Sequence, residues 1–190
     1  MCCCVRNKKS MIMKASYSIR PANKHDASAL AEILTESWKQ AYINLLPMAE
    51  LNATANREKY TAAFSIMLED SLNRFLIAHD RETPCGMIFY RPARDTDSNG
   101  FAEIVSLYTL QPYWGKGLGQ LLMSKALSEI TPIYRGIYLW VFKDNTRARN
   151  FYQKNGFFVD GKMKTEKFSN QPQSIRYIKL LNNGLNNLNS

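Results

Sequence analysis

The chain has 190 residues, 45% hydrophobic and 22% charged, with a formal net charge of +9. This length suits one domain with a single core, and the composition is that of an ordinary globular protein. No apolar stretch approaches the roughly 20 residues of a membrane span, so we expect no membrane partner. The positive charge would suit nucleic acid, but no nucleic-acid-binding motif accompanies it, and we expect no such partner.

The chain ends and the cysteines limit the expected location, metal content and domain bounds. Three of the four cysteines form the run Cys2–Cys4 and Cys85 stands alone, so the sequence contains neither a disulfide framework nor a C-x-x-C metal pattern. We therefore expect a reducing, cytoplasmic location and no metal. The start lacks a hydrophobic segment long enough for a signal peptide. We expect one folded domain over residues 17–181 between disordered tails at 1–16 and 182–190.

The first half of the chain predicts strands and helices in mixed order. Apolar residues recur every three or four positions in the first helix, which is the spacing of one buried face. The predicted elements are a strand at Tyr17–Arg20, a helix from His25 to about Leu45, a more polar helical region from Pro47 to about Leu72, and strands at Arg74–Ala78 and Gly86–Tyr90.

The second half repeats the alternation and ends in two strands. After a polar loop at Arg94–Gly100, the predicted elements are a strand at Phe101–Leu110, a helix at Leu118–Ile130, a strand at Gly136–Phe142, a helix with Asn145 as N-cap and Asn155-Gly156 as its end, and strands at about Val159–Phe168 and Ser174–Leu181. This order indicates an α/β or α+β protein with a mixed sheet.

The most informative segment is Pro112–Gly119, where a strand gives way to a helix. Its glycines at 115, 117 and 119 let backbone N–H groups approach a ligand closely, and the following helix N-terminus adds unpaired donors. Together these features predict a phosphate or pyrophosphate site. The spacing fits neither the dinucleotide fingerprint nor the P-loop.

This turn resembles motif A of the GNAT superfamily of acyl-CoA-dependent N-acetyltransferases, pattern [Gln/Arg]-x-x-G-x-[Gly/Ala]. Gly117 and Gly119 fill its last positions, while Trp114 stands where Gln or Arg is usual. A second stretch, Leu139–Phe157, resembles motif B of the same superfamily, pattern N-x-x-A-x-x-F-Y-x-x-x-G-F. Both motifs occur in order and at the expected separation.

The resemblance implies a GNAT-type fold, with a central, mostly antiparallel sheet of about seven strands flanked by helices. It also implies acetyl-CoA as cosubstrate and a primary amine as acceptor, and homodimers are common in similar proteins, which makes a second copy a candidate partner. The implied cofactor contacts are Leu107, Tyr108, Thr109, Trp114, Gly115, Lys116, Gly117, Leu118, Gly119 and Asn145.

Glu103 is the candidate general base. An alkylammonium has a pKa near ~10.4, so a group must take its proton before it attacks the thioester. Glu103 resembles the basic glutamate of the histone-acetyltransferase branch, eleven residues before the motif-A position. In a regular strand it would share a face with Val105, Leu107 and Thr109. The alternative is a solvent-facing glutamate at a strand start.

Tyr152 is the candidate general acid. It is the Tyr of motif B, and a phenol with a pKa of about 10 can protonate a leaving thiolate. The alternative is a core tyrosine with a satisfied hydroxyl. A Ser-His-Asp triad or a covalent Cys85 carrier has less support, because no G-x-S-x-G elbow occurs and the superfamily transfers the acetyl group directly.

The acceptor is less defined than the cofactor. Residues 22–70 carry a net charge of −3 and the remainder +12. Because the first helices wall the acceptor site in similar proteins, this distribution would suit a cationic, polyamine-like acceptor, or it reflects solvated helix faces. Tyr17, Trp38 and Tyr42 are candidates to line the acceptor pocket. The alternatives are a peptide or protein acetyltransferase, with an N-terminal or lysine amine as acceptor, and a noncatalytic acyl-CoA-binding module.

Overall fold

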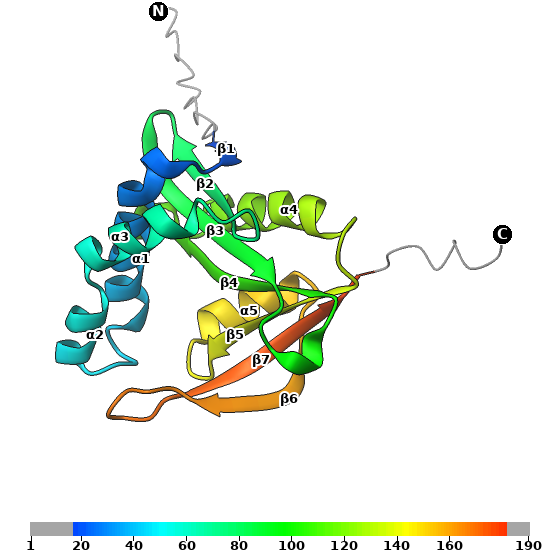
Figure 1. Ribbon diagram of the computed structural model, residues 1–190. Helices are drawn as coiled ribbons and strands as arrows, with labels where there is room; N and C mark the ends of the chain where they lie inside the picture. Colours follow the sequence, from blue (N-terminus) through cyan, green and yellow to red (C-terminus); the bar gives the residue numbers. More distant parts are fainter. Residues whose placement is uncertain (1–16, 182–190) are drawn as a thin grey trace, which may run out of the picture.

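The computed structural model describes residues 17–181, and the predicted tails lie outside this range. Within these residues, seven strands form one sheet, and five α-helices flank it (Figure 1). The elements are β1 (Tyr17–Pro21), α1 (Ala27–Tyr42), α2 (Met48–Thr54), α3 (Arg57–Met67), β2 (Arg74–Asp80), β3 (Thr83–Pro92), β4 (Phe101–Thr109), α4 (Leu118–Ile130), β5 (Gly136–Phe142), α5 (Thr146–Lys154), β6 (Phe158–Thr165) and β7 (Gln173–Leu180). Short 3-10 turns occupy Lys24–Asp26, Thr96–Ser98 and Gln111–Tyr113.

The strand order is β1-β2-β3-β4-β5-β7-β6, and only β4 and β5 run parallel. Successive residues of a strand face opposite sides, so the sheet has two apolar faces. On β2, Phe75 and Ile77 pack with α1 and α3, whereas Leu76 and Ala78 pack with α4. This arrangement confirms the predicted mixed, mostly antiparallel sheet of seven strands.

The helical region after Pro47 is the main departure from the predicted elements. Instead of one polar helical stretch, the chain forms two helices, α2 and α3. The break has a local cause, because the Asn56 side chain accepts a hydrogen bond from the backbone N–H of Lys59 and caps a new helix. The first helix also ends earlier than predicted, at Tyr42.

The neighbouring strands β4 and β5 pair over a short length and then diverge. β4 and β5 pair only where Phe101–Glu103 lie beside Gly136–Tyr138, and both strands continue for several residues without pairing to each other. Figure 1 shows β4 and β5 diverging from each other. At the junction, a Cβ on Gly136 would lie 2.4 Å from Cε2 of Phe101, which explains the glycine there.

A β-bulge interrupts the pairing of β4 with β3. Phe89 pairs with Ser106 but Tyr90 pairs with Ile104, so Val105 is the extra residue. The bulge shifts the alternation of side chains, and Leu107 packs on the α4 face while Val105 packs on the α1 face. The expectation that Glu103, Val105, Leu107 and Thr109 share one face is therefore wrong.

Candidate active site

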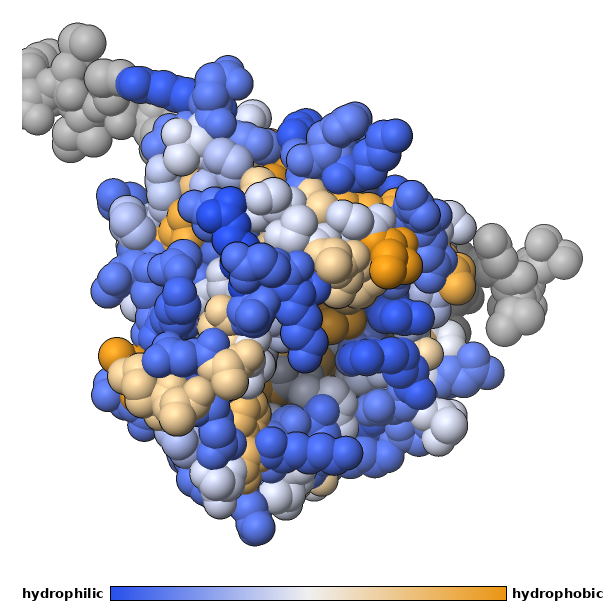
Figure 2. Space-filling model, turned by 60° about the vertical axis from the view of Figure 1, so that its left-hand side comes forward, coloured by the Kyte–Doolittle hydropathy of each residue, from blue (hydrophilic) through white to orange (hydrophobic). Residues whose placement is uncertain are grey.

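A cleft of about 1060 Å³ occupies the opening between β4 and β5. Figure 2 shows a recess on the side of the molecule that comes forward when the view of Figure 1 is turned. Ten of the twelve predicted site residues line the cleft: Glu103, Leu107, Tyr108, Thr109, Trp114, Gly115, Gly117, Gly119, Asn145 and Tyr152. The other two, Lys116 and Leu118, are absent from its lining, and the Leu118 side chain is buried in the core.

The glycine turn forms one end of this cleft. Gly115 and Gly117 have φ of +70° and +85°, which L side chains rarely adopt, and a Cβ on either would meet no atom within 4 Å. Gly117 is the N-cap of α4, and no side chain caps that helix. Its first backbone N–H groups therefore have no side-chain cap to satisfy them, which suits an anionic ligand such as a pyrophosphate.

Trp114 replaces the usual Gln or Arg of motif A with a different contact. Its Nε1 donates a hydrogen bond of 2.7 Å to the carbonyl of Thr109, which joins the turn to the end of β4. The Arg147 guanidinium lies over the indole ring, 3.4 Å from the ring centroid. This cation–π contact brings α5 against the turn and holds a positive charge beside it.

Two motif-B residues reach the cleft from the N-cap and the last turn of α5. Asn145 caps the helix, since its Oδ1 accepts a hydrogen bond from the backbone N–H of Ala148 at 3.1 Å. Tyr152 is 9% exposed and forms ring contacts with Phe151 and Phe157. Its hydroxyl makes no hydrogen bond to any other residue in 17–181, and burial raises its pKa well above that of a free phenol.

Glu103 lies in the cleft wall with an unpredicted partner. The side chain is buried, and Arg94 holds both of its oxygens, with hydrogen bonds of 2.7 Å from Nε and 2.6 Å from an Nη atom. A bidentate pair of this kind fixes the orientation of the carboxylate. Arg94 belongs to the segment predicted only as a polar loop, and no local motif marks it as part of the site.

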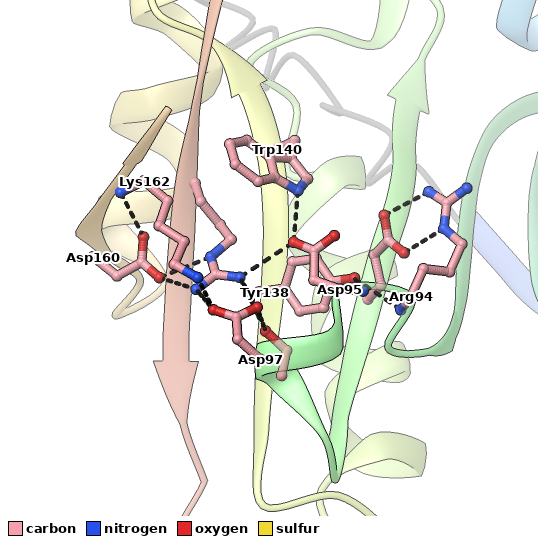
Figure 3. A network of polar contacts seen from close by, with 10 residues as sticks. Arg94, Asp95, Asp97, Tyr138, Trp140, Asp160 and Lys162 are labelled. Carbon is pink, nitrogen blue, oxygen red and sulfur yellow. Dashed lines mark hydrogen bonds and ion pairs between the residues drawn. The ribbon is translucent and has the colours of Figure 1, made fainter. Parts of the chain in front are cut away.

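A polar network holds that loop in place (Figure 3). The Tyr138 hydroxyl accepts hydrogen bonds from the backbone N–H groups of Arg94 and Asp95, at 3.0 and 3.1 Å. Asp95 also accepts a hydrogen bond from Trp140.

The buried Arg176 joins the same loop to the last hairpin. It donates hydrogen bonds to Asp95, Asp97, Ser98 and Asp160. The loop that carries Arg94 is thus tied to β5, β6 and β7.

A cluster of aromatic side chains lines another part of the cleft, called here its aromatic end. The Tyr108 hydroxyl accepts a hydrogen bond from Trp38 Nε1 at 2.8 Å and lies 3.3 Å from the Tyr42 hydroxyl. Tyr42 also makes an edge contact with Phe142. Trp38 and Tyr42 therefore line the cleft as expected, but Tyr17 packs against Tyr113 and is not in its wall.

Comparison with known proteins identifies the family of this chain. The family model for the acetyltransferase (GNAT) family matches residues 29–157. The chain belongs to the GNAT family. It is an acetyl-CoA-dependent N-acetyltransferase with the fold that the two motifs predicted. Within residues 17–181, no helix is both long and apolar enough to cross a membrane.

Individual GNAT relatives are distant in sequence but cover most of the domain. A spermidine N(1)-acetyltransferase of Thermoplasma acidophilum is 28% identical in an alignment of 157 positions that covers 76% of this chain and 90% of the relative. A spermine/spermidine N(1)-acetyltransferase of Bacillus subtilis is 25% identical and covers 63% and 85%. The structure of the PaiA N-acetyltransferase of T. acidophilum with coenzyme A superposes with a TM-score of 0.69, at 25% identity, over 85% of this chain and 98% of that one.

The left-handed glycine of the turn gives a prediction with a matched control. Gly117→Ala places a Cβ at φ +85°, which costs ~1–2 kcal/mol or moves the turn. We expect the KM for acetyl-CoA to rise about tenfold. Gly161→Ala introduces the same strain at φ +90° in β6, outside the cleft, and we expect a similar loss of thermal stability with an unchanged KM. Equal KM values for the two variants would contradict a role for the turn in cofactor binding.

Proposed function

We propose that this acetyltransferase modifies the primary amine of a small molecule. The observation that supports a small acceptor is a bridge between the first helices and the last hairpin. The backbone N–H of Ser169 donates to Glu50 at 3.0 Å, its hydroxyl also bonds Glu50, and the Asn170 amide donates to the carbonyl of Leu45 at 2.9 Å. An extended peptide acceptor would need this side to be open.

The chemistry follows from the two ends of the cleft. Acetyl-CoA lies with its pyrophosphate at the glycine turn, and the amine enters from the aromatic end. The nitrogen attacks the thioester carbonyl, the tetrahedral intermediate collapses, and the thiolate of CoA leaves. Glu103 takes the proton of the ammonium, directly or through water, because two lone pairs of its carboxylate remain beyond those that Arg94 occupies. Tyr152 protonates the departing sulfur, and the second proton that the nitrogen loses on forming the amide returns through water to the Tyr152 oxygen.

The activity is tested by free-CoA release in the presence of a panel of amines. The panel contains spermidine, spermine, monoamines, aminoglycosides and short peptides, because two relatives are named for polyamines and the peptide alternative must be measured directly. We expect release only with small amines. Release with peptides alone would overturn the proposal, and tight acetyl-CoA binding without any release would favour the noncatalytic module.

Tyr152→Phe removes the hydroxyl and keeps the packing of the ring. We expect kcat to fall by about 10² or more, as for the loss of a general acid, with little change in the KM for acetyl-CoA. Because burial raises the Tyr152 pKa, the hydroxyl stays protonated throughout the assay range, so the parent enzyme should not lose activity through Tyr152 ionisation up to pH 9. A Tyr152→Phe enzyme as fast as the parent would contradict this role.

Glu103→Gln replaces the carboxylate with an uncharged group of the same shape. We expect the loss in kcat/KM to be largest near pH 7 and to shrink as the pH rises, since a growing fraction of the amine is then already deprotonated. The measurement is the pH profile of both enzymes, with thermal unfolding to show that the loss of the Arg94 pair has not unfolded the variant. Parallel profiles would mean that water or another residue takes the proton.

A further inference from the structure

The side chains at the aromatic end of the cleft indicate the chemical class of the acceptor, which family membership alone does not define. The end is defined here by five side chains that line the cleft: Trp38, Tyr42, Tyr108, Phe142 and Phe168. Tyr42 meets Trp38 and Phe142 edge-on, with centroids 5.2 and 5.0 Å apart, and Phe142 meets Phe168 at 6.3 Å. These contacts make a continuous apolar wall from α1 through the end of β5 to the β6–β7 hairpin.

The carboxylates of the cleft are already neutralised. Of the described acidic residues, only Glu103 and Glu166 line it. Glu103 is paired with Arg94 at 2.6 Å, and Glu166 with Lys164 at 3.4 Å. Neither carboxylate is left as free counter-charge for an additional ammonium group.

The acidic residues that gave the first helices their negative charge lie elsewhere. Glu32 pairs with Arg57 and Glu36 with Lys39, all on exposed surface, and Asp26 pairs with Arg20. None of the seven acidic residues between positions 22 and 70 lines the cleft, so the negative charge of this segment does not belong to the cleft wall. The wall next to the acceptor is apolar, not acidic.

Two further aromatic rings in the cleft are not available to a cationic ligand. Lys164 lies 4.7 Å from the Trp140 ring centroid and Arg176 lies 5.9 Å from it, while Arg147 covers Trp114. A second cation at these rings would be repelled by the one already there. By contrast, the Ser37 hydroxyl, 2% exposed and in the cleft wall, has no hydrogen-bond partner among residues 17–181. It can serve one polar group of a ligand.

We propose that the acceptor is a monoamine whose primary amine is joined by a short linker to an apolar, preferably aromatic, body. This inference rests on the proposed function and names its substrate class. The apolar body is stabilised by burial against the five rings. A polyamine would instead bring extra ammonium groups next to apolar rings and paired carboxylates, where each loses water without gaining a free counter-charge.

The test compares phenethylamine, hexylamine and spermidine by free-CoA release with the full-length chain at saturating acetyl-CoA. We expect kcat/KM to be at least tenfold higher for phenethylamine than for spermidine, with hexylamine between them. Equal or higher kcat/KM for spermidine would overturn the inference while leaving the small-amine function in place. Release with none of these three amines would overturn the inference, and release with none of the small amines in the wider panel would overturn the proposed function itself.

A pair of variants locates the preference in the wall. Phe168→Glu places an unpaired carboxylate at the aromatic end, and Phe168→Leu keeps the site apolar. We expect the phenethylamine-to-spermidine ratio of kcat/KM to fall at least tenfold in Phe168→Glu and to keep its direction in Phe168→Leu. Equal ratios in the two variants, with both proteins folded by thermal unfolding, would show that this wall does not select the acceptor.

Discussion

The structure depends on how briefly β4 and β5 pair. A central sheet normally gains stability from every pair of neighbouring strands, and here the two central strands share only three residue pairs before they separate. The lost pairing leaves backbone edges facing each other across a gap, in the middle of the molecule rather than at its rim. The cleft, the glycine turn beyond β4 and the helix beyond β5 all take their positions from this divergence.

The two ends of the cleft use different parts of the chain. The proposed cofactor end is built mainly from backbone, with left-handed glycines and a helix N-terminus that no side chain caps. The proposed acceptor end is built from side chains contributed by α1, β4, β5 and the last hairpin. A backbone site persists at low sequence identity, whereas a side-chain site changes with each substitution. Family membership therefore fixes the cosubstrate more firmly than the acceptor.

The sequence predicted the features that depend on local signals. The order of the strands and helices, the turn at Gly115–Gly119 and the Asn145 cap follow from spacing and from residues with special backbone preferences. The bulge at Val105 could not be predicted, because Phe101–Thr109 contains no Gly or Pro that would mark an interruption of a regular strand. Nor could the pairing of Arg94 with Glu103, since a loop conformation set by Tyr138 brings them together. Contacts between distant segments, such as Ser169 with Glu50, have no local signal at all.

The buried Arg176 has a consequence for how the protein folds. Its partners Asp95, Asp97 and Asp160 come from the loop before β4 and from β6, far apart along the chain. A guanidinium buried without these carboxylates would carry a large desolvation penalty. The C-terminal hairpin therefore gains little by docking before that loop is formed, and the loop gains little without the hairpin. Arg176 thus couples the part of the sheet formed by β1–β4 to the part formed by β5–β7. The two parts fold as one cooperative unit, although β4 and β5 diverge between them.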